Sequence, residues 1–258
     1  MQPLRIVTTS WDDGHPFDLR IAEVLRARGM CGTFYIPIHY ERRRRMDAAA
    51  IRALHAEGFE IGGHGLLHVP LPKLDPALLS VESSACKQIL AHIVGEEIRT
   101  FCYPFGRYDA DVIRSLKGIG YESSRTTRML STGFDFDPFL MPTTVQAFPH
   151  TRVAYLRNIA RGRNLRDLPT SVATMNRVAG WADLAKALFD RVDREGGVWH
   201  LYGHSWEIEK LGLWDELKAV LDYVSKRDDV YYVTNRDVLK FLPRFHASEL
   251  PARDLFAT

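Results

Sequence analysis

The sequence predicts an α/β protein whose parallel sheet closes, or nearly closes, into a barrel. Strand-like and helix-like segments alternate along most of the 258 residues, and the connections between them are short. Six to eight strands in one domain favour a barrel over an open sheet, and single α/β barrels commonly reach this length. Polar residues suited to chemistry also follow several strand candidates directly, where a parallel barrel places its active site. We therefore expect residues 1–258 to form one domain.

The first half of the chain shows the alternation most clearly. Asp47 is a candidate N-cap, and Asp75 precedes Pro76 as an N-cap precedes a proline at the first helical position. Gly29 and Gly58 are typical helix stops. The expected strands are residues 4–10, 33–36, 59–61, 99–103 and 121–124, and the expected helices are residues 17–28, 47–54, 75–94 and 109–117.

The pattern weakens between Thr126 and about Gly180. This stretch contains four prolines, a strand candidate at residues 143–147 and an arginine-rich piece at residues 152–166. We interpret residues 126–180 as an irregular excursion from the barrel, partly loop. Regular elements then return as a helix at 183–195, a strand at 198–202, a helix at 214–225, a strand at 230–233 and a capping box at Thr234 and Asp237.

Composition excludes several classes of protein. Hydrophobic content of 46% and charged content of 26% are ordinary for a soluble globular protein, and a net charge of +2 argues against a nucleic-acid binder. No apolar run approaches the ~18 residues that a membrane helix needs, and no secretory signal is visible. The three cysteines form no CxxC pair, which suits a reducing cytoplasm and argues against disulfides and a thiolate zinc site. We expect a cytoplasmic protein.

Asp12 and Asp13 follow the first strand and precede Gly14. At the end of a strand, with a glycine that lets the chain turn, both carboxylates can point toward one cleft. A cation would explain the pair, because it can hold one carboxylate and leave the other free as a base. The alternative is that Asp13 caps the helix that begins near Pro16.

His64 and His68 follow the third strand, separated by four positions. This spacing lets two imidazoles reach one metal ion, and a carboxylate with two histidines leaves coordination positions open for water and substrate. The alternative is a surface loop with two unrelated histidines, since the chain has ten.

Arg99 begins the fourth strand, and the turn Pro104–Gly106 ends it. A buried arginine needs a carboxylate partner, and Asp12 is a candidate. The turn can aim backbone N–H groups at a developing oxyanion. An ordinary strand and turn is the alternative.

Residues 197–207 run along a late strand and into an expected loop. His200 and His204 share strand parity, so they face the same way. His204 is nearer the carboxyl end and is the better candidate for a general acid, whereas we expect His200 in the core or wall. We expect Tyr103, Pro104, Tyr202 and Trp206 to contact substrate, although aromatic residues at such spacings are more often core.

Four consecutive arginines, Arg42 to Arg45, precede the helix that Asp47 caps. We favour a solvated loop. The sharper alternative is contact with an anionic substrate phosphate or with nucleic acid.

Together these segments resemble the polysaccharide deacetylase family, the NodB-homology domain of carbohydrate esterase family four. The resemblance extends from Thr9 to about Thr234. Each motif alone is weak, but their order along the chain, each after a predicted strand, is specific. The matching segments are Ser10-Trp-Asp12-Asp13-Gly14, His64-x-x-x-His68, Arg99-x-x-x-x-Pro104-Phe105-Gly106 and Leu201-Tyr-Gly-His204, the last with one extra residue between Leu and His.

The resemblance implies a distorted (β/α)7 barrel of NodB type. It also implies that Asp13, His64 and His68 hold a divalent metal, usually zinc, with Co2+, Ni2+ or Mn2+ as alternatives.

Four further roles come from the resemblance. Asp12 would be the general base, and Arg99 would orient and charge-balance it. The backbone N–H of Phe105 would join the oxyanion hole, and His204 would protonate the leaving amine.

The sequence departs from the family in one motif. The fourth motif, which contains Asp and Trp and tunes the catalytic histidine, has no counterpart that we can find, and the 126–180 excursion occupies its place. The partner of His204 is therefore open. The sequence does not give the oligomeric state, the acyl group or the sugar.

We expect a metal-dependent hydrolase of a linear amide that removes an N-acyl group from an amino sugar, a glycan or a sugar precursor. One alternative is an enzyme that opens a small cyclic ureide or imide. The other is a catalytically silent carbohydrate-binding barrel.

Overall fold

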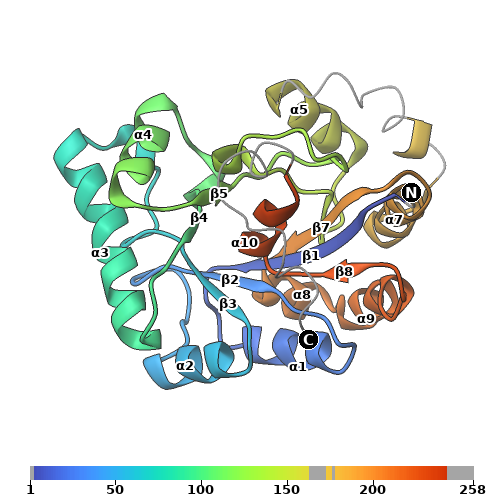
Figure 1. The fold of residues 1–258 in the computed structure, drawn as a ribbon, viewed down its shortest axis with the longest axis horizontal. Helices are drawn as coiled ribbons and strands as arrows, with labels where there is room; N and C mark the ends of the chain where they lie inside the picture. The colour runs from blue at the N-terminus through green and yellow to red at the C-terminus, as the bar shows by residue number, and fades with distance from the viewer. Residues whose placement is uncertain (1–2, 163–172, 176–177, 243–258) are drawn as a thin grey trace.

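A parallel sheet forms the centre of the protein. The computed structural model describes residues 3–162, 173–175 and 178–242. The strands follow the order β5–β4–β3–β2–β1–β7–β6, and β8 pairs with β1 off this path (Figure 1). Their bounds are β1 Arg5–Asp12, β2 Thr33–Ile36, β3 Glu60–Gly63, β4 Thr100–Cys102, β5 Ser123–Arg125, β6 Val145–Gln146, β7 Gly197–Gly203 and β8 Tyr231–Tyr232.

Strand β1 is the centre of the sheet. It pairs with β7 from Arg5 to Trp11, with β2 through its last three residues, and with β8 through Ile6 and Val7. All these pairings are parallel, and every residue of β1 after Arg5 is buried. The carboxyl end of β1, at Asp12, therefore lies in the middle of one edge of the sheet.

The barrel closes through a bridge. Among the described residues, β5 and β6 do not pair as strands, but Met141, shortly before β6, forms a parallel bridge with Arg125. The Met141 N–H donates to the Ser124 carbonyl at 3.1 Å, and the Thr126 N–H donates to the Met141 carbonyl at 2.8 Å. The distorted (β/α)7 barrel is confirmed.

Helices surround the strands, with α1, α2, α3, α4, α7 and α9 around the outside in Figure 1. The α-helices are α1 Asp18–Arg26, α2 Ala48–Ala56, α3 Pro76–Val94, α4 Ala110–Ile119, α5 Arg152–Gly162, α7 Trp181–Glu195, α8 Ser205–Leu211, α9 Trp214–Val224 and α10 Asn235–Val238. Short 3-10 turns are η1 Leu71–Lys73, η2 Pro104–Gly106, η3 Pro138–Leu140 and η4 Leu239–Phe241.

Local signals explain why α2, α3 and α4 begin where they do. The side chains of Asp47, Asp75 and Asp109 each accept a hydrogen bond from the N–H three residues later. Helices α3 and α4 end at Gly95 and Gly120, whose φ angles of 79° and 90° a glycine adopts without steric penalty. Strands β4 and β5 follow these two helix ends after short connections.

Two helices differ from the expectation. Helix α5 occupies part of the arginine-rich piece of the excursion, and α8 follows His204 directly where we expected a loop. Strand β6 lies within the expected 143–147 segment. Residues 163–166 of the arginine-rich piece lie outside the described residues. Of the described helices, none is both long enough and apolar enough to cross a bilayer.

Candidate metal centre and active site

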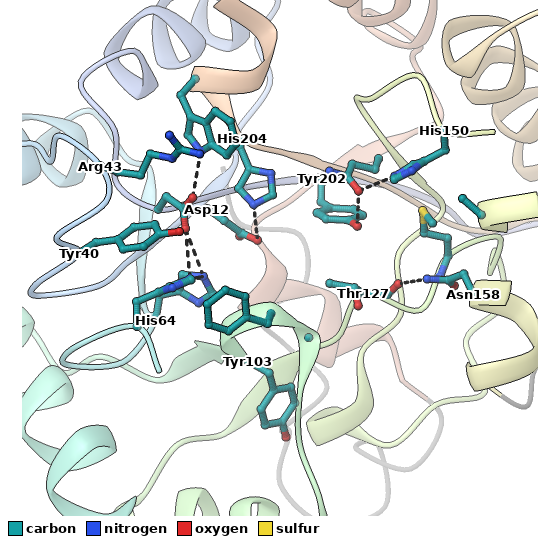
Figure 2. Close-up of a pocket in the computed structure, with 18 of the residues that line it drawn as sticks. Asp12, Tyr40, Arg43, His64, Tyr103, Thr127, His150, Asn158, Tyr202 and His204 are labelled. Atoms are coloured by element: carbon teal, nitrogen blue, oxygen red, sulfur yellow. Dashed lines mark hydrogen bonds and ion pairs between the residues drawn. The ribbon is translucent and has the colours of Figure 1, made fainter. Parts of the chain in front are cut away.

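The carboxyl end of β1 brings both aspartates into one buried site. Asp13 has a φ of 78° and Gly14 a φ of 60°, so the chain turns in the left-handed region directly after the strand. Aspartate tolerates this region better than most residues. Both carboxylates are 3% exposed, and both line the same pocket. Figure 2 shows Asp12 in this pocket. Asp13 does not cap α1, whose N-cap position has no side-chain hydrogen bond.

His64 and His68 come from β3 and the loop that follows it. The Nδ1 of His64 lies 2.8 Å from the Cys102 carbonyl oxygen, which leaves its Nε2 free to face the pocket. Glu82 fixes the loop, because its carboxylate accepts a hydrogen bond from the Leu67 N–H at 2.8 Å. The ring of His68 stacks on Tyr40, with centroids 4.2 Å apart.

Three ligand atoms converge in this pocket. The Oδ1 of Asp13 lies 3.3 Å from His68 Nε2 and 3.7 Å from His64 Nε2, and the two imidazole nitrogens are 3.2 Å apart. Ligands bound about 2.1 Å from one zinc ion at tetrahedral angles are roughly 3.4 Å from each other. The Oδ1 of Asp13 is buried without a hydrogen-bond partner. These three side chains fit a divalent metal.

The two imidazoles are held in the form that binds metal. Burial lowers the pKa of His64 to about 4. Burial and the neighbouring His64 lower the pKa of His68 to about 3. Both rings are therefore neutral near pH 7, with ring nitrogens available as ligands.

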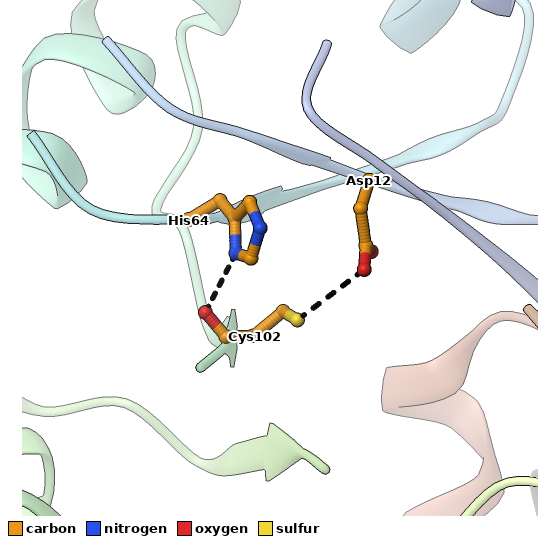
Figure 3. A group of neighbouring side chains, drawn as sticks. All are labelled: Asp12, His64 and Cys102. Atoms are coloured by element: carbon orange, nitrogen blue, oxygen red, sulfur yellow. Dashed lines mark hydrogen bonds between the residues drawn. The ribbon is translucent and has the colours of Figure 1, made fainter. Parts of the chain in front are cut away.

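A second group, Asp12, His64 and Cys102, overlaps the first (Figure 3). The Cys102 thiol lies 3.8 Å from Asp12 Oδ2. Burial raises the pKa of Cys102 well above its usual value, which disfavours the thiolate that a metal requires. Because the free nitrogen of His64 faces Asp13 and His68, the first group is the better metal site.

Asp12 pairs with Arg125, so the prediction that Arg99 is its partner is wrong. The Nη2 of Arg125 donates a short hydrogen bond to Asp12 Oδ1, and Arg125 is fully buried at the end of β5. Arg99 lies just before β4, where its guanidinium pairs with Glu97 at 3.1 Å and Glu122 at 2.5 Å. In a parallel sheet, the start of a strand lies at the opposite edge from the end of β1. Arg99 therefore cannot reach Asp12.

Arg125 keeps Asp12 ionised. Burial by itself would raise the pKa of this carboxyl, but the charge of Arg125, assisted by His64 and His204, lowers it to about 2. Arg125 holds Oδ1 of Asp12, whereas Oδ2 receives the weaker contact of the Cys102 thiol at 3.8 Å and faces His204 Nε2 at 3.9 Å.

His204 lies across the pocket from Asp12 and pairs with Glu207. Its Nδ1 is 2.7 Å from Glu207 Oε2, and its Nε2 is 3.9 Å from Asp12 Oδ2. Burial by itself would lower the pKa of His204, but the hydrogen bond to Glu207 and the charges of Asp13 and Asp12 raise it to about 9. The imidazolium is therefore the prevailing form near pH 7.

Glu207 also links His204 to the far wall of the pocket. Gln146 donates to Glu207 Oε2 at 3.2 Å and accepts from the Tyr202 hydroxyl at 2.7 Å. His150 lies 2.7 Å from the same Gln146 oxygen. The pair His204–Glu207 thus belongs to a connected polar network.

The four expected substrate contacts have different surroundings. Trp206 donates from Nε1 to Asp13 Oδ2 at 2.9 Å, and Tyr202 and Tyr103 also line the pocket. The Tyr103 hydroxyl, however, donates to the Phe139 carbonyl at 2.9 Å. Pro104 is buried in η2 and does not line the pocket.

Phe105 lies at the mouth of the site. Its φ is 59°, its side chain is half exposed, and its ring contacts the edge of His68 with centroids 4.6 Å apart. Like Asp13, and like His68 with a φ of 52°, it holds a left-handed backbone conformation. Three non-glycine residues around the ligand atoms therefore carry backbone strain.

The pocket encloses about 590 Å³. In Figure 2, Asp12, Tyr40, Arg43 and His64 lie on one side, and Thr127, His150 and Asn158 lie on the other. Asn158 belongs to α5, so the excursion supplies one wall.

Sequence reasoning missed Arg125, Glu207 and Arg43 as site residues. Arg125 ends a strand that we expected to stop at Ser124, and an arginine at that edge is a usable signal. Glu207 follows His204 at helical i+3 spacing, which a helix starting at Ser205 would have revealed. Arg43 lay in a run that we interpreted as solvated.

The fold and the site define a class: a NodB-type (β/α)7 barrel with an Asp–His–His set at the carboxyl ends of its strands. Residues 2–124 match the family model of polysaccharide deacetylase. Over 125 residues the chain is 24% identical to YxkH of Bacillus subtilis (strain 168), whose name places it provisionally among polysaccharide deacetylases. That match covers 48% of this chain and 45% of YxkH. The resemblance to the polysaccharide deacetylase family is confirmed, and the N-terminal half carries it.

Solved structures share the fold over nearly the whole chain. A protein of Mycobacterium smegmatis, provisionally called a polysaccharide deacetylase, superposes with a TM-score of 0.63 at 15% identity, over 99% of this chain and 95% of that chain. The chitin deacetylase of the fungus Colletotrichum lindemuthianum gives 0.58 at 17% identity, over 92% and 89%. BA3943 of Bacillus anthracis, a family-four pseudoenzyme, gives 0.56 at 13% identity, over 92% and 66%. The fold therefore hosts both active and inactive proteins.

Proposed function

We propose that this chain is a metal-dependent amide hydrolase that removes an N-acetyl group from an amino sugar or from a glycan that contains one. The observation that carries the proposal is the convergence of Asp13, His64 and His68 beside the ionised carboxylate of Asp12. The family match and the chitin deacetylase among similar structures support the substrate class.

The residues around the metal site have separable tasks. Asp13, His64 and His68 would hold a divalent ion, and this ion would supply the Lewis acidity that polarises an amide carbonyl and acidifies a water molecule. Oδ2 of Asp12, which is not paired with Arg125, takes a proton from the attacking water. The backbone N–H of Phe105 remains the candidate donor to the developing oxyanion.

His204 completes the reaction as general acid. When the carbon–nitrogen bond breaks, the leaving amine needs a proton, and the imidazolium of His204 can donate it from Nε2. Glu207 holds the opposite ring nitrogen and favours the charged form. Glu207 thus tunes the catalytic histidine, which in the family is the role of the fourth motif that this sequence lacks.

Metal content and acetate release test this function together. We expect the wild-type protein to hold one equivalent of zinc after loading and to release acetate from N-acetylated chito-oligosaccharides. Asp12→Asn should keep the zinc and lose turnover by a factor of about 10² to 10⁴, because it removes a base and no ligand. Asp13→Ala should lose the zinc.

His55→Ala is the matched control, because His55 lies outside the pocket and pairs with Glu96 at 3.7 Å. It should keep both zinc and turnover. Stoichiometric zinc in Asp13→Ala would remove Asp13 from the ligand set, and full turnover in Asp12→Asn would remove Asp12 from the mechanism.

Two other functions have distinct readouts. Ring opening of a cyclic ureide would consume substrate without acetate release. A silent carbohydrate-binding barrel would bind sugar oligomers without taking up metal. The cytoplasmic location stays a prediction.

A further inference from the structure

Arginines without an ion-pair partner surround the pocket. Arg43 and Arg157 line it, and Arg107 and Arg128 line an adjoining cavity of about 570 Å³. No ion pair joins any of these four guanidinium groups to another residue in the part of the chain that the structure describes. They come from separate segments, so the cavities draw positive charge from several elements.

The two cavities lie side by side. Phe105, Gly106, Thr127 and Asn158 line both of them. Among the described residues, the acidic lining of the first cavity consists of Asp12 and Asp13, and the second has no acidic lining. Arg125 balances Asp12, and a divalent metal would balance Asp13. The positive charge at the rim is therefore uncompensated, and such a cleft attracts anions.

Arg43 is fixed close to the metal site. Its guanidinium carbon lies 3.7 Å from the centroid of the Trp206 ring, and Trp206 in turn donates to Asp13. The backbone N–H of Arg43 donates to the backbone carbonyl of Tyr40 at 3.1 Å, and the Tyr40 ring stacks on His68. The loop that carries Arg43 is thus anchored on two metal-ligand candidates.

The stacking leaves the donors of Arg43 available. A guanidinium that lies flat on an aromatic ring keeps its five N–H groups directed outward in its own plane, which matches the oxygens of a phosphate or a carboxylate. No hydrogen bond from the Arg43 side chain to another described residue competes for these donors. A solvated loop, which the sequence favoured, would not require this placement.

We propose that the substrate carries an oxyanion, a phosphate or a carboxylate, and that Arg43 binds it beside the metal site while Arg157, Arg107 and Arg128 draw it into the cavities. The proposal rests on the proposed function, because it names the class of amino sugar that the same pocket accepts. An acidic sugar fits both the arginine rim and the 590 Å³ volume.

Binding to the metal-free protein tests this proposal without turnover. The probes are N-acetylglucosamine, N-acetylglucosamine 1-phosphate and N-acetylmuramic acid, titrated by calorimetry into the chelator-treated protein. Removing the metal prevents phosphate from binding the ion itself. We expect at least one acidic probe to bind about tenfold more tightly than the neutral sugar, as charge-assisted hydrogen bonds to arginine imply. The phosphate and the carboxylate arms tell the two sources of oxyanion apart.

The variants assign the effect to Arg43. Arg43→Ala should remove most of the advantage of the acidic probe, whereas Arg42→Ala, which removes the same charge from the same run outside the pocket, should change affinity less than about twofold. Thermal melts verify that both variants fold.

Two outcomes would overturn the proposal: equal affinity for neutral and acidic probes, or equal losses in Arg43→Ala and Arg42→Ala. Acetate release from neutral oligosaccharides, with none from the acidic probes in the zinc-loaded protein, would also reject the acidic substrate and leave the hydrolase proposal intact. Tight binding of the acidic probe without any turnover would reject the hydrolase proposal and leave the oxyanion site intact.

Discussion

The two ends of the barrel use the same charged residue types in opposite ways. At the amino ends of the strands, Arg5 pairs with Asp229, and Arg99 and Arg236 both pair with Glu122, in partly exposed positions. At the carboxyl ends, Arg125 is fully buried against Asp12, and Arg43 has no ionic partner among the described residues. At the amino ends, the arginines form partly exposed ion pairs. At the carboxyl ends, Arg125 forms a buried ion pair, and the guanidinium of Arg43 remains available to bind an anion. An arginine's contribution therefore depends on which end of its strand it occupies.

Removal of Arg125 should produce the largest effect on stability. Truncating one partner of a buried ion pair leaves an uncompensated charge, so Arg125→Ala should lower the free energy of unfolding of the metal-free protein by about 3–5 kcal/mol. Arg99→Ala removes a partly exposed pair and should lower it by about 1 kcal/mol or less. Denaturant unfolding measures both.

Arg125→Lys guards against a variant that does not fold, because it keeps the charge and loses the planar donor group. The free energy of unfolding of Arg125→Lys should lie between those of the wild type and Arg125→Ala. Equal losses in the free energy of unfolding in Arg125→Ala and Arg99→Ala would contradict the difference that we infer between the two ends of the barrel.

A glutamate at each end allows a second comparison. The pKa of His204 is raised from 6.5 to about 9, so the proton stabilises the folded metal-free protein below pH 6.5, and this stabilisation is lost as the pH rises through about 9. Glu207→Gln removes the charge and weakens the hydrogen bond that raise this pKa. The free energy of unfolding should then vary less with pH over this range. In the zinc-loaded enzyme, the alkaline limb of the activity profile should move to lower pH.

Glu122→Gln is the control from the opposite end, because Glu122 pairs with Arg99 and Arg236 and makes no contact with the pocket. It should leave the alkaline limb in place. A limb that moves equally in both variants would exclude Glu207 as the partner that sets the pKa of His204.

Backbone strain gives the smallest expected effect. Phe105 near the metal site and Lys226 at the opposite end share nearly the same φ, 59° and 58°. Lys226→Gly should raise the free energy of unfolding by up to about 1 kcal/mol, because glycine adopts this conformation without a Cβ clash. Phe105→Gly should gain less, because it also loses the ring contact with His68. Chemical denaturation of both variants measures the difference, and a larger gain in Phe105→Gly would contradict it.

The sequence predicted those parts of the site that depend on local spacing. Asp12 ends β1, Asp13 follows it, and His64 and His68 follow β3. Strand ends in a parallel barrel meet at one edge, so the pattern was sufficient to predict that these residues lie together. The helix starts at Asp47, Asp75 and Asp109 were visible for the same reason, because an N-cap is a local feature.

The partners of these residues depend on tertiary contacts that no motif encodes. Arg99 was chosen by its position in a motif, although a residue at the start of β4 lies about 10 Å from the end of that strand at the rise of ~3.3 Å per residue. Strand geometry alone could have rejected it and pointed to Arg125. Glu207 depended on α8, which was expected to be loop, and Arg43 depended on the stacking of a long side chain on Trp206.

Asp13, His68 and Phe105 share one further consequence through their left-handed backbones. Each conformation opposes folding, least at Asp13 because aspartate tolerates this region better than most residues, and glycine would relieve the steric part of it at any of the three. A lineage that no longer needed the ion could therefore become more stable by drifting to glycine there. Glycine at these three positions in a relative would then indicate that the relative has lost the metal-dependent activity.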